Sequence, residues 1–83
     1  MLTHLNLSFN RITDVSALAH LVNLRLLDVS HNKIVSLDSV RDLTSLHTLR
    51  CQHNYLEALE PLLGLMNLAE LWVGDNRYVR MRV

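Results

Sequence analysis

Hydrophobic and polar positions follow the same order in a unit that recurs along the chain. The unit opens on a leucine at Leu2, Leu24, Leu46 and Leu68, a spacing of 22 residues, and the residues between these leucines align without a gap. Early in each unit an apolar, a polar and an apolar residue alternate, as in residues 5–7 of the first unit. This period of two is expected of a half-buried β-strand, so the pattern predicts one short strand per unit.

The units span residues 2–23, 24–45, 46–67 and 68–83, the last of them incomplete. Their fourth, sixth and eleventh positions are mostly leucine, isoleucine or valine, and give the pattern LxxLxLxxNxL. In the last two units the sixth position holds Cys51 and Val73, and the eleventh holds Leu56 and Tyr78. We expect the side chains of the fourth and sixth positions to point into a core.

The ninth position of every unit is asparagine: Asn10, Asn32, Asn54 and Asn76. After each strand the chain must turn, which leaves buried backbone groups that need partners. A carboxamide both donates and accepts, so a stack of inward-facing asparagines can satisfy successive turns. We expect the loss of one such asparagine to cost roughly 1–3 kcal/mol of stability.

In the second half of each unit the chain must return to the start of the next strand within about ten residues. That length suits a 3₁₀ segment or one to two helical turns. Asp14, Asp38 and Glu60 precede the expected helical segments, and Pro61 suits a first helical position. An alternative is a set of ordinary amphipathic helices in an α+β domain. The constant spacing of the units speaks against it.

The pattern LxxLxLxxNxL resembles leucine-rich repeats. In unit length the chain resembles the 22-residue subclass typified by the nuclear regulatory subunit of protein phosphatase 1, which also includes an outer-arm dynein light chain, many ciliary and flagellar proteins, and bacterial internalins. The resemblance implies an α/β solenoid, a right-handed arc with short parallel strands on its concave face and 3₁₀ or short helical turns on its convex face. It also implies that the concave sheet binds another protein, without saying which.

Composition narrows the class of partner. Lys and Arg together number 8, as do Asp and Glu, so the formal net charge is zero and nothing favours nucleic acid or an anionic membrane. An RNA-associated repeat is therefore disfavoured. One cysteine cannot form an internal disulfide, and neither a signal peptide nor a membrane-spanning run is visible. We expect a cytoplasmic protein without a cofactor, in a setting that could be cytoskeletal or ciliary.

The ends of the array lack the polar caps that a solenoid needs. Met1 directly precedes the first repeat leucine, and the fourth unit stops at Val83 before its convex return. The sequence thus predicts a piece of a longer array, and leaves self-association through the uncapped ends open.

The concave face is where partner contacts are expected, because its side chains are free of packing. The residues expected there are His4, Asn6, Phe9, Leu26, Asp28, His31, Arg50, His53, Glu70, Trp72 and Asp75. Within this set, Arg50 should lie one strand from both Asp28 and Trp72, in reach of an ion pair and a cation–π contact. Arg and Trp are also the residue types that dominate interface hot spots, which makes them the expected centre of binding.

A neighbouring column reads Phe9, His31, His53 and Asp75, here expected on consecutive strands. Two imidazoles and a carboxylate could approach one metal, but a flat row spaced at about 4.8 Å fits a zinc tetrahedron badly. A pH-sensitive interface is the better interpretation of the two, because histidine titrates near neutral pH. The plainest interpretation is a solvated polar row on a binding face.

The remaining candidates for chemistry are weaker. Cys51 falls at a core position and is expected to be a packed apolar residue rather than a nucleophile. His4, His20 and His47 show no shared arrangement in the sequence, and Arg77, Arg80 and Arg82 are expected on the surface of the last repeat. With no phosphate-binding loop, nucleophile–base pair or close carboxylate pair, the sequence predicts a protein-interaction module that is not an enzyme. The alternative is a repeat segment of a larger regulatory or enzymatic protein.

Overall fold

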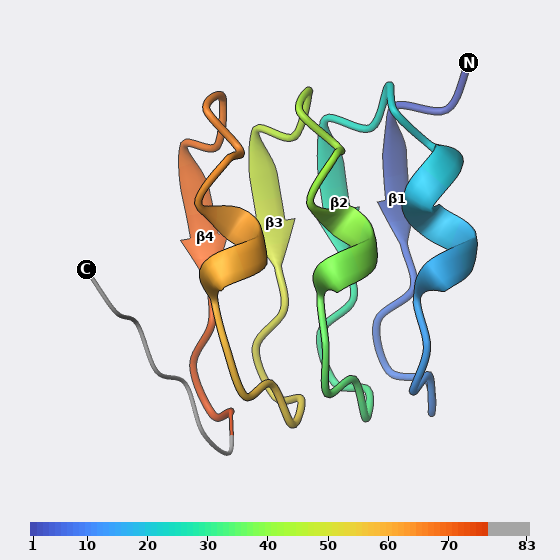
Figure 1. Ribbon diagram of the computed structural model, residues 1–83. Helices are drawn as coiled ribbons and strands as arrows, with labels where there is room; N and C mark the ends of the chain where they lie inside the picture. The colour runs from blue at the N-terminus through green and yellow to red at the C-terminus, as the bar shows by residue number, and fades with distance from the viewer. Residues whose placement is uncertain (77–83) are drawn as a thin grey trace.

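One short strand from each repeat joins a single parallel sheet in the computed structural model, which describes residues 1–76 (Figure 1). The strands are β1 (His4–Asn6), β2 (Leu26–Asp28), β3 (Thr48–Arg50) and β4 (Glu70–Trp72), and they lie side by side in chain order. The central leucine of each strand pairs with the leucine one unit on, as Leu27 does with Leu49. The fold class predicted from the repeat is confirmed. The column position Tyr78 and the three C-terminal arginines lie outside the described residues.

Three 3₁₀ helices cover one face of this sheet: η1 (Ser16–His20), η2 (Asp38–Val40) and η3 (Glu60–Leu62) (Figure 1). Their type matches the expectation of a short convex return. Their starts differ in detail, because Asp38 and Glu60 are the first helical residues and do not precede the helix. Asp14 does precede η1, and its Oδ1 accepts a hydrogen bond of 2.8 Å from the N–H of Ser16.

The core lies between the sheet and the helices, and it is built from the apolar columns. Its fully enclosed side chains include Leu24, Leu27, Val29, Ile34, Leu43, Leu46, Leu49, Cys51 and Leu56. Because all of these come from the second and third repeats, the middle of the array is the best-packed part of the described chain. Burial also raises the pKa of the Cys51 thiol to about 12, which keeps it protonated at neutral pH.

The asparagine column connects neighbouring repeats through hydrogen bonds. The amide nitrogen of Asn32 donates to the carbonyl of Val29 in its own repeat at 2.9 Å and to that of Leu7 in the preceding repeat at 3.0 Å. Its Oδ1 accepts from the N–H of Ile12 at 3.0 Å. Asn54 and Asn76 repeat this arrangement one and two units further along. Each of these three side chains therefore satisfies backbone groups in two repeats at once.

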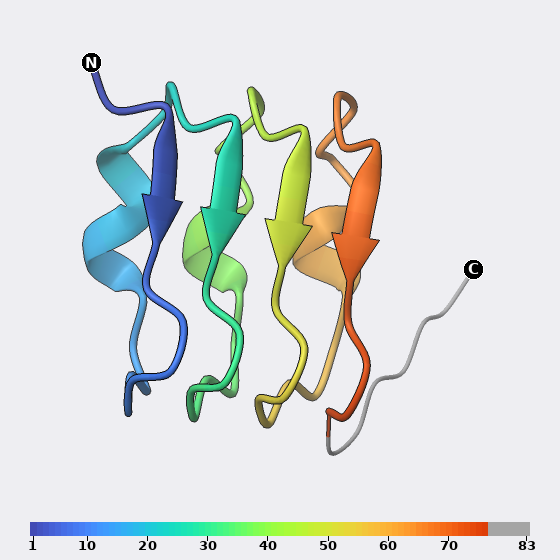
Figure 2. The same ribbon diagram turned by 180° about the vertical axis from the view of Figure 1, so that it is seen from behind.

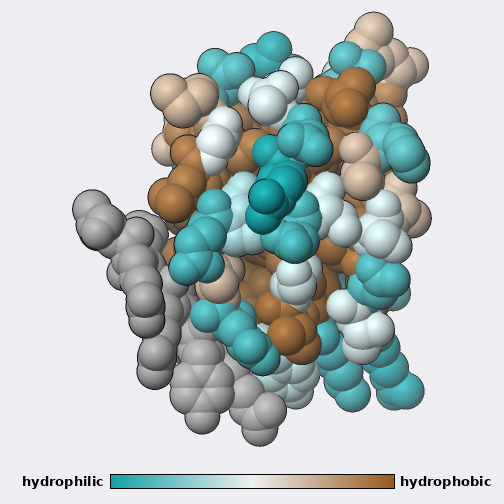
Figure 3. Space-filling view, viewed as in Figure 1, coloured by the Kyte–Doolittle hydropathy of each residue, from teal (hydrophilic) through white to brown (hydrophobic). Residues whose placement is uncertain are grey.

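The helix-side surface carries polar and apolar side chains interspersed (Figure 3). Two exposed apolar residues of the third repeat, Leu63 and Met66, belong to the segment that follows η3. No helix within residues 1–76 is both long enough and apolar enough to cross a bilayer.

Candidate functional site

The strand face is the side of the sheet turned away from the 3₁₀ helices, and corresponds to the concave face of the expected arc (Figure 2). Side chains alternate along a strand, so the first and third residue of each strand share this face. They are His4 and Asn6 on β1, Leu26 and Asp28 on β2, Thr48 and Arg50 on β3, and Glu70 and Trp72 on β4. This face is most buried at the middle strands and exposed at both outer ones: Asp28 and Thr48 are buried, whereas His4 and Asn6 are exposed and Trp72 is 51% exposed.

Arg50, Glu70 and Trp72 form a connected cluster between β3 and β4. The indole Nε1 of Trp72 donates a hydrogen bond of 2.7 Å to Glu70 Oε2. The same carboxylate oxygen lies 3.7 Å from Arg50 Nη2, and the Arg50 guanidinium carbon lies 5.5 Å from the centroid of the Trp72 ring. One carboxylate thus holds a cation and an indole in fixed positions at the surface. The expected contact between Arg50 and Trp72 is present.

The expected ion pair between Arg50 and Asp28 is wrong. Asp28 is 8% exposed, and its Oδ1 accepts hydrogen bonds from the N–H of Ser30 at 3.0 Å and from its hydroxyl at 2.6 Å. This turn already satisfies the carboxylate, and Glu70 on the other side of β3 supplies the acid for Arg50. Asn6 binds Ser8 in the same way one repeat earlier. Asp28, the last residue of β2, therefore has little surface to offer a partner.

A second row, Phe9, His31, His53 and Asp75, lies three residues beyond the ends of the strands, not on the strands as expected. The rings of Phe9 and His31 stack at 4.1 Å between centroids, and those of His31 and His53 at 4.2 Å. His53 Nδ1 lies 3.1 Å from Asp75 Oδ2, which continues the row to the fourth repeat. Phe9 is 75% exposed, so the row ends in an open aromatic ring.

Stacking also explains why this row is a poor metal site. The lone pair of an imidazole nitrogen lies in the plane of its ring, so nitrogens of two stacked rings point in parallel directions and do not converge on one ion. Consistent with this, no group of three or more His, Cys, Asp or Glu side chains within residues 1–76 could hold a metal.

The backbone of this row is a feature that sequence reasoning missed. Phe9, His31, His53 and Asp75 all have positive φ, between 54° and 58°. Histidine and aspartate are among the side chains enriched in this left-handed region, whereas phenylalanine gains no such advantage. The available signal was the column itself, which directly precedes the invariant asparagine of each turn and is rich in residues that tolerate this conformation.

The margin of the strand face where the strands begin was also missed. His4, Arg25 and His47 line one surface cavity of about 210 Å³, together with Leu26 and Thr48. His4 and His47 therefore do share an arrangement, contrary to the expectation from the sequence. They come near each other around the second repeat: His4 pairs in register with Leu26 of that repeat, and His47 holds the same repeat position as Arg25, which precedes Leu26.

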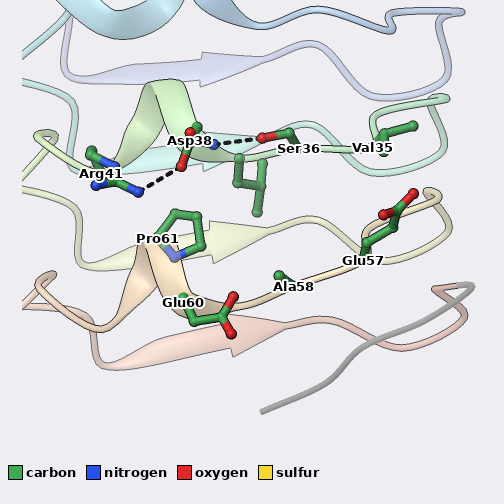
Figure 4. A pocket seen from close by; sticks show the side chains of 9 residues that line it. Val35, Ser36, Asp38, Arg41, Glu57, Ala58, Glu60 and Pro61 are labelled. Atoms are coloured by element: carbon green, nitrogen blue, oxygen red, sulfur yellow. Dashed lines mark hydrogen bonds and ion pairs between the residues drawn. The ribbon is translucent and has the colours of Figure 1, made fainter. Parts of the chain in front are cut away.

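Another hollow lies on the helix side, between the segments that contain η2 and η3 (Figure 4). Asp38 and Arg41 form an ion pair of 2.6 Å in its wall, and Glu57 and Glu60 add two further carboxylates. Its nine lining residues include no histidine or cysteine, so this part of the described chain lacks the usual nucleophile–base pair. The hollow is separate from the cluster on the strand face.

Comparisons with known proteins agree with this architecture. The family model for leucine-rich repeats in two copies matches residues 1–43. Internalin C2 from Listeria monocytogenes is 36% identical over 96% of this chain and 35% of its own, with a TM-score of 0.93. A leucine-rich repeat protein of Leptospira interrogans is 31% identical over 90% of this chain and 20% of its own, with a TM-score of 0.84.

A plant peptide hormone receptor, RGFR1 in complex with RGF2, is 26% identical over 98% of this chain and 14% of its own, with a TM-score of 0.81. The chain thus spans between 14% and 35% of the length of these three solved chains. No curated protein matches it significantly.

Proposed function

The chain belongs to the leucine-rich repeat family, and we propose that it is a protein-interaction module that holds a partner protein against its strand face. The single observation that carries this proposal is the cluster of Arg50, Glu70 and Trp72. Hot spots of protein interfaces are enriched in Trp and Arg, and side chains already fixed in position lose less entropy on binding.

The residues proposed to contact the partner extend from this cluster over the strand face and over the second row beyond the ends of the strands. Phe9, His31, His53 and Asp75 form one continuous surface, to which Asn6 and Leu26 on the first two strands are added. An exposed aromatic ring bordered by polar groups is typical of a contact surface. Asp28 is excluded from the set because its carboxylate is buried in a turn.

The similarity to the plant receptor supports the proposal at the level of fold. That receptor is in a complex with RGF2, and repeat solenoids generally bind partners through extended surfaces of this kind. We propose a scaffolding role without catalysis for the present chain, because its strand face offers contact groups rather than an enclosed site.

A finer proposal concerns the setting. The 22-residue unit supports a relation to the subclass typified by the nuclear regulatory subunit of protein phosphatase 1, and with it a cytoplasmic, cytoskeletal or ciliary role. Under this finer proposal the repeats are a segment of a larger regulatory or enzymatic protein, such as a phosphatase regulator or a dynein-associated component.

Affinity capture with matched variants tests the interaction proposal. The double variant Arg50→Ala plus Trp72→Ala removes two members of the cluster, and Arg41→Ala plus Leu63→Ala removes an exposed charge and an exposed apolar side chain from the helix side. We expect partners captured by the unmodified chain to be retained by the helix-side variant and lost from the strand-face variant. Circular dichroism would check that both variants fold. Loss from the helix-side variant alone would contradict the proposal.

A further inference from the structure

Two surface cavities meet at the margin where the strands begin, and Arg25 and His47 line both of them. The first, of about 210 Å³, also includes His4. The second, of about 330 Å³, is completed by Ser45 and Asn67. Because both cavities share Arg25 and His47, we treat their combined lining as one site, which we call the rim site.

The Arg25 guanidinium has no hydrogen-bond or ion-pair partner within residues 1–76. This distinguishes it from Arg41, which pairs with Asp38, and from Arg50, which pairs with Glu70. The described residues that line the rim site include no aspartate or glutamate. Arg25, a cation without an ionic partner among the described residues, therefore lines an open hollow without a carboxylate in its walls.

Two imidazoles of the rim site are oriented by neighbouring hydroxyls. His47 Nδ1 lies 3.2 Å from the Thr48 hydroxyl, and His4 Nδ1 lies 3.0 Å from the Thr3 hydroxyl. When the hydroxyl donates to Nδ1, the neutral ring carries its proton on Nε2, which is then a donor for a ligand. Protonation of either ring adds a positive charge to the site.

We propose that the rim site binds an oxyanion, with Arg25 as its main ligand and His47 and His4 as further donors. The guanidinium fork matches the geometry of carboxylate and phosphate oxygens, and hydrogen bonds to a charged group are the strong ones. Ser45 lines the larger cavity, and its hydroxyl adds a neutral donor. The chemistry of this lining takes a carboxylate or a phosphate monoester, and excludes a cation.

The position of the rim site connects it to partner binding. His4, Leu26 and Thr48 line it and also belong to the strand face, so a protein seated there would reach it with an acidic or phosphorylated side chain. This assignment of the anion to a partner side chain rests on the proposed function. The anion site itself does not, because it depends only on the residues of this chain.

Nuclear magnetic resonance titration of the chain with inorganic phosphate, at ionic strength held constant with sodium chloride, tests the site. We expect saturable shifts of the His47 and His4 ring signals and of the Arg25 side chain. Arg25→Gln should weaken phosphate binding about tenfold or more, as the loss of a charge-assisted hydrogen bond predicts. Arg11→Gln, at an exposed cation outside both cavities, should leave the dissociation constant unchanged.

His47→Gln adds a second readout, because it removes one of the proposed donors and should also weaken phosphate binding. Identical phosphate curves for the unmodified chain and Arg25→Gln, or shifts that chloride alone reproduces, would overturn the proposal.

Parallel titrations with acetate and methyl phosphate distinguish the two sources of the anion. Preference for methyl phosphate supports a phosphorylated side chain, and equal binding of acetate supports a carboxylate. Because these measurements need no partner protein, their failure is separable from failure of the affinity capture with the strand-face variant.

Discussion

Glu70 Oε2 accepts a hydrogen bond of 2.7 Å from Trp72 Nε1, and this contact joins two side chains of the same strand above the surface of the sheet. Residues two apart on a strand share a face, which is what lets the carboxylate reach the indole. Arg50, one strand away, approaches both of them. The glutamate therefore acts as a positioning residue for the two side chains that we expect to contact a partner.

Glu70→Ala should free the indole while leaving the fold intact. Exposed ion pairs contribute about 0–1 kcal/mol, so the free energy of unfolding should change by less than about 1 kcal/mol. Trp72 is the only tryptophan of the chain, so intrinsic fluorescence reports on it alone. We expect an altered emission maximum and stronger quenching by acrylamide. Glu57→Ala, at a carboxylate on the helix side, is the matched control and should leave the fluorescence unchanged. Unaltered emission in Glu70→Ala would show that the hydrogen bond does not position the ring.

Asn54→Ala should destabilise the fold more than Asn10→Ala. Asn54 is 4% exposed and its side chain bonds to the carbonyls of Val29 and Cys51 and to the N–H of Ile34. Its loss leaves buried backbone groups without partners, at a cost of about 1–3 kcal/mol or more. Asn10 is exposed and bonds only within its own repeat, so water can replace it. Urea unfolding of both variants measures the difference. Equal destabilisation of the two variants would mean that the hydrogen bonds between repeats add nothing to the free energy of unfolding.

Cys51 provides a prediction on pH. Burial raises the pKa of its thiol from 9.0 to about 12, so the folded chain holds the neutral form over a range in which the unfolded chain ionises. The stability from this effect is fully present below pH 9 and is lost as the pH rises toward 12. Unfolding free energy should therefore fall more steeply across that window in the unmodified chain than in Cys51→Ala. At pH 8, alkylation by iodoacetamide should be about a thousandfold slower in the folded than in the unfolded chain, a factor that corresponds to the shift of the pKa. Comparable rates would contradict burial of the thiol.

The parts of the fold that follow from the repeat were predictable, because one strand and one turn recur at fixed positions. Leu27 and Leu49 pair as their shared column requires, and the helical segments are short because the return is short. The strand-face contact of Arg50 with Trp72 followed from the same register.

The remaining features of the site depend on which of several neighbouring groups a side chain bonds to, and an aligned column of residues does not reveal that choice. Asp28 is as near to Arg50 in the register as Trp72 is, yet Ser30 satisfies its carboxylate first. The rim site was missed for another reason. Arg25 and His47 stand just before the expected strands, where no alternation marks them as surface neighbours, and the hollow arises only from the stacking of repeats.

His31 tests the backbone of the second row, where φ is 55°. A β-branched side chain in the left-handed region clashes with the backbone, whereas asparagine tolerates it. We therefore expect His31→Ile to be less stable than His31→Asn by about 1–2 kcal/mol. Both variants remove the stacking on Phe9 and His53, so that loss cancels in the comparison and the difference isolates the backbone conformation. Urea unfolding monitored by circular dichroism measures it. A His31→Ile variant as stable as His31→Asn would show that the turn can change its conformation without cost, and that the stacked row is not fixed by the backbone.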